Sequence, residues 1–146
     1  MFRRTLLSMT VALALVALVT GTVSAANAHF IGTPSLSING GTATVTFKAA
    51  GLGNVETATF TLSGDVTISS RCYTKSGMKP QAANKQETIP VDATGTFPVS
   101  NGQTTGSISF TAPGSTLDCP RGQIAVVEGV SFDGLVLSGE GLTYEF

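Results

Sequence analysis

The stretch "SLSINGGTATVTFKA" (residues 35–49) indicates the fold class of this chain. In its second half apolar residues alternate with threonines, and in its first half Leu36 and Ile38 alternate with serines. A period of two is typical of β-strands with one buried face. The "NGG" between the halves favours a tight turn, so the two strands are expected to pair as a hairpin. The buried face of the second strand is predicted to contain Ala43, Val45 and Phe47.

The same alternation recurs along the rest of the chain, with Gly, Pro, Asn or Asp in the gaps. No window of useful length has apolar residues at helical spacing. We therefore expect an all-β, antiparallel, immunoglobulin-like β-sandwich of about seven to nine short strands. Besides the first hairpin, the predicted strands are "VETATFTL" (55–62), "VTISSRCY" (66–73), "ETIPV" (87–91), "GTFPV" (95–99), "GSISFTA" (106–112), "QIAVVEGVSF" (123–132), "GLVLSG" (134–139) and "LTYEF" (142–146).

The N-terminal segment has the pattern of a secretory signal peptide. Arg3 and Arg4 precede an apolar run over residues 5–19, and the small-residue triplet "ANA" (26–28) matches a cleavage site. The run is shorter than the ~20 residues that a transmembrane helix needs. The prediction is a signal peptide over residues 1–28, a single β-sandwich domain over residues 29–146, and a secreted or extracellular location, either free or associated with the cell surface.

Charge and composition exclude some classes of partner. Without residues 1–28 the chain holds six basic and nine acidic residues, a formal charge of −3. This balance is too acidic for a nucleic-acid-binding protein. Only 12% of the residues are charged, so hydroxyl groups and small side chains must cover most of the surface.

The two cysteines predict a disulfide. Cys72 and Cys119 are the only cysteines, and an oxidising compartment favours a bond between them. Such a bond could tie the two sheets together, and it is expected to contribute ~4 kcal/mol to stability. A zinc site would need further ligands at close spacing, which the sequence does not have.

One polar segment lacks the alternation and is predicted to be a loop. The stretch "RCYTKSGMKPQAANKQE" (71–87) contains four of the six basic residues that follow the leader. Loops on rigid scaffolds often carry recognition, so this stretch is the candidate binding loop, although charge runs more often only solvate a surface. Its candidate contact residues are Arg71, Lys75, Met78, Lys79 and Lys85.

The single histidine, His29, would become the N-terminal residue after cleavage behind residue 28. A terminal amine and its own imidazole can chelate Cu(II), with a carboxylate such as Glu128 or Asp133 as a further ligand. Copper binding through His29 is therefore an alternative, and otherwise no cofactor is expected. Histidine-brace monooxygenases need a second histidine, which the chain does not have.

Catalysis is not expected from this sequence. Nucleophilic hydrolases usually need a histidine base within the fold, and the acidic residues are spaced like turn and surface residues. A third possibility is a small outer-membrane β-barrel, because "GLTYEF" (141–146) ends on an aromatic residue. Barrel strands of ~9 to 11 residues with a continuous apolar band do not match the short strands predicted here.

The mature segment resembles small secreted actinobacterial-type β-sandwich proteins of uncharacterised function. The resemblance lies in "AHFIGTPSLSINGGTATVTFKAAGLGN" (28–54), "GMKPQAANKQ" (77–86), the pair Cys119 and Pro120, and "VSFDGLVLSGEGLTYEF" (130–146). It implies a secreted, disulfide-linked β-sandwich and no particular activity. The leading hypothesis is a non-catalytic protein that acts by binding or structural association at the cell surface, with self-association through strand edges as a further possibility.

Overall fold

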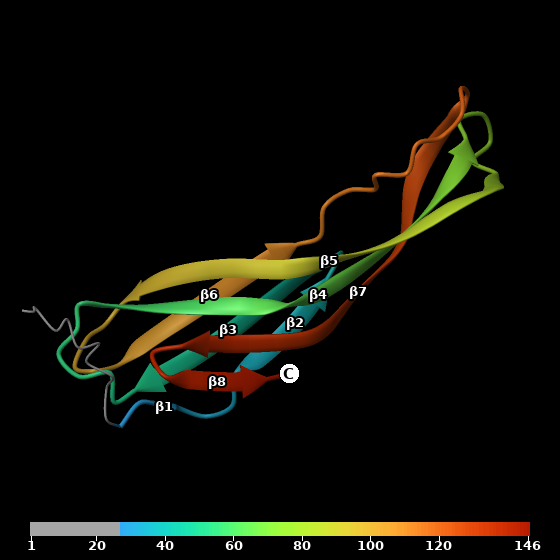
Figure 1. The fold of residues 1–146 in the computed structure, drawn as a ribbon. Coiled ribbons are helices and arrows are strands. Elements are labelled where there is room, and N and C mark those ends of the chain that lie inside the picture. Colours follow the sequence, from blue (N-terminus) through green and yellow to red (C-terminus); the bar gives the residue numbers. More distant parts are fainter. Residues whose placement is uncertain (1–26) are drawn as a thin grey trace, which may run out of the picture.

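The computed structural model describes residues 27–146 as an all-β chain with two antiparallel sheets (Figure 1). The predicted signal peptide lies outside these residues, except for its last two positions. Residues 27–146 contain no helix and therefore none that could span a membrane. The predicted all-β class, the antiparallel pairing and the disulfide between Cys72 and Cys119 are confirmed.

The first sheet, sheet A, is built around strand β3 (Thr42–Ala50). β1 (His29–Phe30) and β2 (Ser35–Asn39) pair with opposite ends of one edge of β3, and β6 (Thr104–Thr111) pairs with its other edge. The second sheet, sheet B, has the strand order β5-β4-β7-β8. Its strands are β4 (Thr57–Thr74), β5 (Pro80–Pro98), β7 (Gln123–Gly139) and β8 (Leu142–Glu145).

The hairpin predicted from "SLSINGGTATVTFKA" is confirmed. Asn39 pairs with Thr42, which leaves Gly40 and Gly41 as a two-residue turn with φ of 57° and 83°. Two consecutive positive φ angles match the twist of a hairpin, and glycine adopts them without steric cost. Because this turn sets the register, Ala43, Val45 and Phe47 of β3 point to one face, where they are buried.

The core contains residues from both sheets. Phe47 of β3 lies 4.5 Å, ring centre to ring centre, from Phe60 of β4 and 5.4 Å from Phe97 of β5. Such aromatic contacts add to the stabilisation from apolar burial. The other large buried side chains of this core include Leu52, Leu62, Val66, Ile68, Val91, Ile108, Leu135 and Leu137.

Rows of hydroxyl groups cover the outward faces of both sheets. On sheet A the hydroxyl of Thr44 lies 2.9 Å from that of Ser109, and on sheet B Thr61 lies 2.9 Å from Thr94. Further cross-strand pairs of the same kind are Thr42–Thr111, Thr59–Thr96 and Thr67–Thr88. Paired hydroxyls of this kind support strand pairing, and they explain how a surface with few charges remains polar.

Three strands are much longer than predicted. The expected breaks within residues 55–73, 87–99 and 123–139 are absent, and β4, β5 and β7 run for 18, 19 and 17 residues. The prediction of short strands is wrong here because Gly64 and Gly134 form an irregularity within the β4–β7 pairing rather than a turn. Pro90 lies on β5, an edge strand, where a missing N–H need not break the ladder.

The long strands extend sheet B beyond sheet A as a three-stranded arm (Figure 1). We define the arm as residues 69–87 and 113–131, and the rest of the described chain as the body. Sheet A cannot cover the arm because its longest strand, β3, has only nine residues. The arm must therefore be stabilised by contacts other than packing against sheet A.

Candidate functional site

The predicted binding loop is a β-hairpin. Residues 71–74 belong to β4 and residues 80–87 to β5, so only residues 75–79 form the turn. The prediction of a loop is wrong because alternation marks only strands with one buried face, whereas β5 is largely exposed here. The predicted contact residues thus lie on the two strands of the arm and on the turn between them, where they occupy three different environments.

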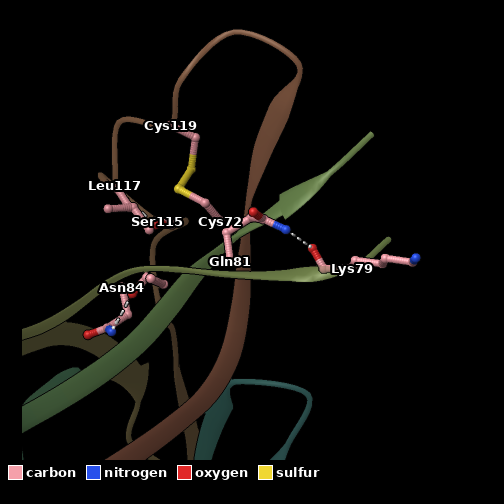
Figure 2. The surroundings of a disulfide bond; sticks show 8 residues. Cys72, Lys79, Gln81, Asn84, Ser115, Leu117 and Cys119 are labelled. Atoms are coloured by element: carbon pink, nitrogen blue, oxygen red, sulfur yellow. Dashed lines mark hydrogen bonds between the residues drawn. A yellow bond between two sulfur atoms is a disulfide. The ribbon is translucent and has the colours of Figure 1, made fainter. Parts of the chain in front are cut away.

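Within the arm, the disulfide attaches the β6–β7 connection (residues 112–122) to strand β4 (Figure 2). Cys72 of β4 is fully buried and bonds Cys119 of the connection. The expectation that the bridge could tie the two sheets together is wrong, because Cys119 belongs to neither sheet. The connection takes the place of sheet A on the inner face of the arm, where Ser70 is also buried.

Lys85 helps to hold the connection in place. Its ammonium group lies 2.9 Å from the carboxylate of Glu87 and donates a 2.7 Å hydrogen bond to the hydroxyl of Thr116. Thr116 in turn donates to Glu87 from its hydroxyl and its backbone N–H. These hydrogen bonds from Thr116 and Lys85 hold the pKa of the Glu87 carboxyl below its ordinary value. Lys85 is therefore part of the support of the arm.

Arg71 also has an intramolecular partner. Its Nε lies 3.4 Å from Oε2 of Glu128, and the hydroxyl of Tyr73 donates a 2.6 Å hydrogen bond to the other carboxylate oxygen, Oε1. This hydrogen bond to Glu128 raises the pKa of Tyr73 above its ordinary value. Glu128 reaches both residues from a bulge in β7, where it has no register partner on β4. Arg71, Tyr73 and Glu128 thus brace β4 against β7.

The remaining predicted residues, Lys75, Met78 and Lys79, lie at the end of the arm. We define the tip as residues 74–80 and 120–124. The turn closes through a 3.0 Å hydrogen bond from the Thr74 N–H to the Lys79 carbonyl oxygen. The N–H of Lys75 donates to Gly122, which brings the segment that follows Cys119 alongside the turn. Figure 2 shows the side chain of Lys79 pointing away from the disulfide.

The structure adds two residues to the tip that the sequence analysis did not select. Arg121 precedes Gly122 and so lies beside Lys75, and Ile124 of β7 is the register partner of Tyr73. Arg121 could have been found from the predicted disulfide, because bonding Cys72 to Cys119 brings residues 120–122 near residues 73–75. Ile124 carried no such signal, since an apolar strand residue is ordinarily assigned to the core.

Charge separates the arm from the body. Within residues 27–146 the arm holds five of the six basic residues and three of the nine acidic residues, a formal charge of +2. The body has one basic and six acidic residues, a formal charge of −5. The ion pairs found within this range involve Arg71 and Lys85, and neither of these pairs includes Lys75, Lys79 or Arg121.

The alternative copper ligand, His29, lies on β1 of the body. Its Nδ1 is within hydrogen-bond distance, 2.8 Å, of the backbone oxygen of Asn27. Glu128 belongs to the arm, at the opposite end of the molecule from β1 (Figure 1), and Asp133 pairs with Asp65 in sheet B. Within residues 27–146 no three His, Cys, Asp or Glu residues lie close enough together to hold a metal ion.

Two hollows lie on the body. The first, about 260 Å³, opens where the chain leaves sheet A between β1 and β2, and Lys48 is its one charged residue. The second, about 400 Å³, is lined by Pro98, Ser100, Gln103, Thr104 and Thr105. The first hollow could donate hydrogen bonds to a small polar molecule, but it has no pair of acid and base groups. The other residues that line it are Ile31, Thr33, Ser35, Thr46, Phe47 and Thr105.

The chain matches no family model, no curated protein and no solved structure. A functional assignment therefore depends on the geometry and charge of the arm.

Proposed function

We propose that this protein is a secreted, non-catalytic β-protein that acts by binding at the cell surface, with the tip of the arm as its contact surface. The observation that carries this proposal is the set of tip cations, Lys75, Lys79 and Arg121, on an otherwise acidic protein. Since the described ion pairs do not use them, they are available to an anionic partner. The predicted leader and the disulfide support an extracytoplasmic location.

An immunoglobulin-like fold is the scaffold we propose for this function. The strand order supports it: β5-β4-β7-β8 corresponds to strands C′, C, F and G, and β2-β3-β6 corresponds to A, B and E. Two features distinguish the chain from antibody domains. It has no tryptophan, and its disulfide joins β4 to a connection rather than one sheet to the other.

Charge reversal at the tip tests the proposal. A triple variant, Lys75→Glu, Lys79→Glu and Arg121→Glu, is expected to lose most of its retention on cell envelopes while its thermal unfolding is nearly unchanged. Lys48→Glu is the matched control, because it reverses a lysine of the body. If the triple variant stays with the envelope fraction as the wild type does, the tip is not the contact surface.

A further inference from the structure

We propose that the tip binds the surface of an anionic lipid bilayer, with Met78 and Ile124 entering the interface and the neighbouring cations contacting lipid headgroups. This inference rests on the proposed function and specifies the chemistry of the partner. It is carried by the apolar side chains at the tip, which an interaction through charge alone would not use.

Met78 is the main observation. Its side chain is 52% exposed, and its backbone has a φ of 47°. Positive φ is rare and costly for a long side chain, and a turn of this kind normally has Gly or Asn at such a position. Neither the backbone conformation nor burial in the core therefore favours methionine. A strained, exposed apolar residue at the end of an arm is instead suited to contact with a partner.

Ile124 adds to the apolar surface of the tip. It is 36% exposed, although it lies on a strand of sheet B. Its register partner Tyr73 also pairs with Pro80, so the three residues form a row across the arm on one face. This row lies next to the turn that holds Met78. The tip thus presents a small apolar surface together with positive charge.

A bilayer surface can use both features at once. Lysine and arginine are attracted to anionic headgroups, while exposed apolar side chains enter the boundary between headgroups and acyl chains. A polyanionic polymer would use only the charges. The acidic body is repelled by an anionic surface, so a membrane would favour approach with the tip first.

Sedimentation of the folded protein with lipid vesicles tests this inference. We expect binding to vesicles of phosphatidylcholine with phosphatidylglycerol and much weaker binding to phosphatidylcholine alone. Met78→Asn is expected to weaken binding to the anionic vesicles about tenfold, since the apolar side chain is lost. Lys75→Gln is expected to weaken it about fivefold, through loss of one charge near the surface. Ile38→Thr is the matched apolar control, because Ile38 is also 52% exposed but lies on the body.

Three results would overturn the bilayer inference: no binding to anionic vesicles, equal binding to both kinds of vesicle, or equal effects of Met78→Asn and Ile38→Thr. If vesicles are not bound but the triple charge reversal still releases the protein from cell envelopes, the proposed function stands and the partner is a polyanion. If substitutions at the tip change neither vesicle binding nor retention on cell envelopes, both proposals fail.

Discussion

At the scale of single residues, Glu87 shows how a surface charge supports the arm. Its ionised carboxylate accepts hydrogen bonds from Thr116 and Lys85, which lower its pKa. A pKa that is lower in the folded than in the unfolded state contributes stability above the ordinary pKa of glutamate. That contribution is lost as the pH falls through the lowered value.

Glu87→Gln tests this linkage. We expect the variant to unfold at a lower temperature than the wild type at neutral pH, and the difference to shrink towards strongly acidic pH. Thermal unfolding followed by circular dichroism over this pH range measures it. Glu145→Gln, at the end of β8, is the control and should behave like the wild type. A difference that is constant with pH would show that ionisation of Glu87 does not matter.

For Met78 we expect substitution to increase the stability of the protein, whereas substitution of Glu87 is expected to decrease it. Asparagine tolerates positive φ better than methionine, so Met78→Asn is expected to raise the free energy of unfolding by ~1 kcal/mol. Chemical denaturation measures the change. A loss of stability would mean that Met78 makes contacts on which the fold depends, and it would remove the argument that this residue is there for a partner.

At the scale of elements, the arm depends on the attachment of its strand β4 to the β6–β7 connection. Replacing both cysteines with alanine is expected to cost ~4 kcal/mol, because the disulfide restricts the unfolded chain. Urea unfolding of the double variant measures the loss. In the double variant, amide hydrogen exchange should become faster than in the wild type, and the increase should be larger in residues 112–122 than in β3. An unchanged urea midpoint would contradict a stabilising role for the bridge.

The centre of the core offers a second test of an element. A Cβ added to Gly106 of β6 would lie 2.5 Å from Phe47 and 3.0 Å from Phe97. Gly106→Ala is therefore expected to cost ~1–3 kcal/mol through overpacking, as measured by denaturant unfolding. Gly114→Ala in the connection is the control, since nothing lies within 4 Å of its added Cβ. If Gly106→Ala and Gly114→Ala are equally stable, the rings of Phe47 and Phe97 can move to make room for the added methyl group.

Alternation predicted the elements well wherever a strand has one buried face. It identified β3 and its inward residues because Val45 and Phe47 face the core and the threonines face solvent. It failed at Gly64 and Gly134, since glycine fits an irregular ladder as readily as it fits a turn. It also failed along residues 80–87, because much of β5 there is exposed and has no apolar stripe to detect.

At the scale of the whole molecule, the long strands separate a cationic tip from an acidic body. The sequence predicted the lysine-rich segment, but it did not predict which of its lysines form intramolecular contacts and which are exposed. Lys85 is engaged with Glu87 and Thr116, whereas Lys75 and Lys79 are exposed at the tip. Arg121 joins them only through the folding back of the connection, a long-range contact that the predicted disulfide indicates but that no local pattern encodes.

This arrangement predicts binding that depends on salt. Attraction between exposed tip cations and an anionic surface falls off within the Debye length, ~10 Å at 0.1 M salt and ~3 Å at 1 M. We therefore expect retention on cell envelopes to fall steeply as salt is added over this range. The triple charge-reversed variant should show a weak salt dependence. Retention that is independent of salt would contradict a contact made through the tip cations.

Hydrogen–deuterium exchange of the wild-type protein, with and without cell envelopes, tests the central claim most directly. If the tip is the contact surface, added protection should be confined to residues 74–80 and 120–124, and the hydroxyl-rich outer face of sheet A should exchange as before. Protection centred on sheet A or on the free edge of β8, with the tip unchanged, would contradict the account.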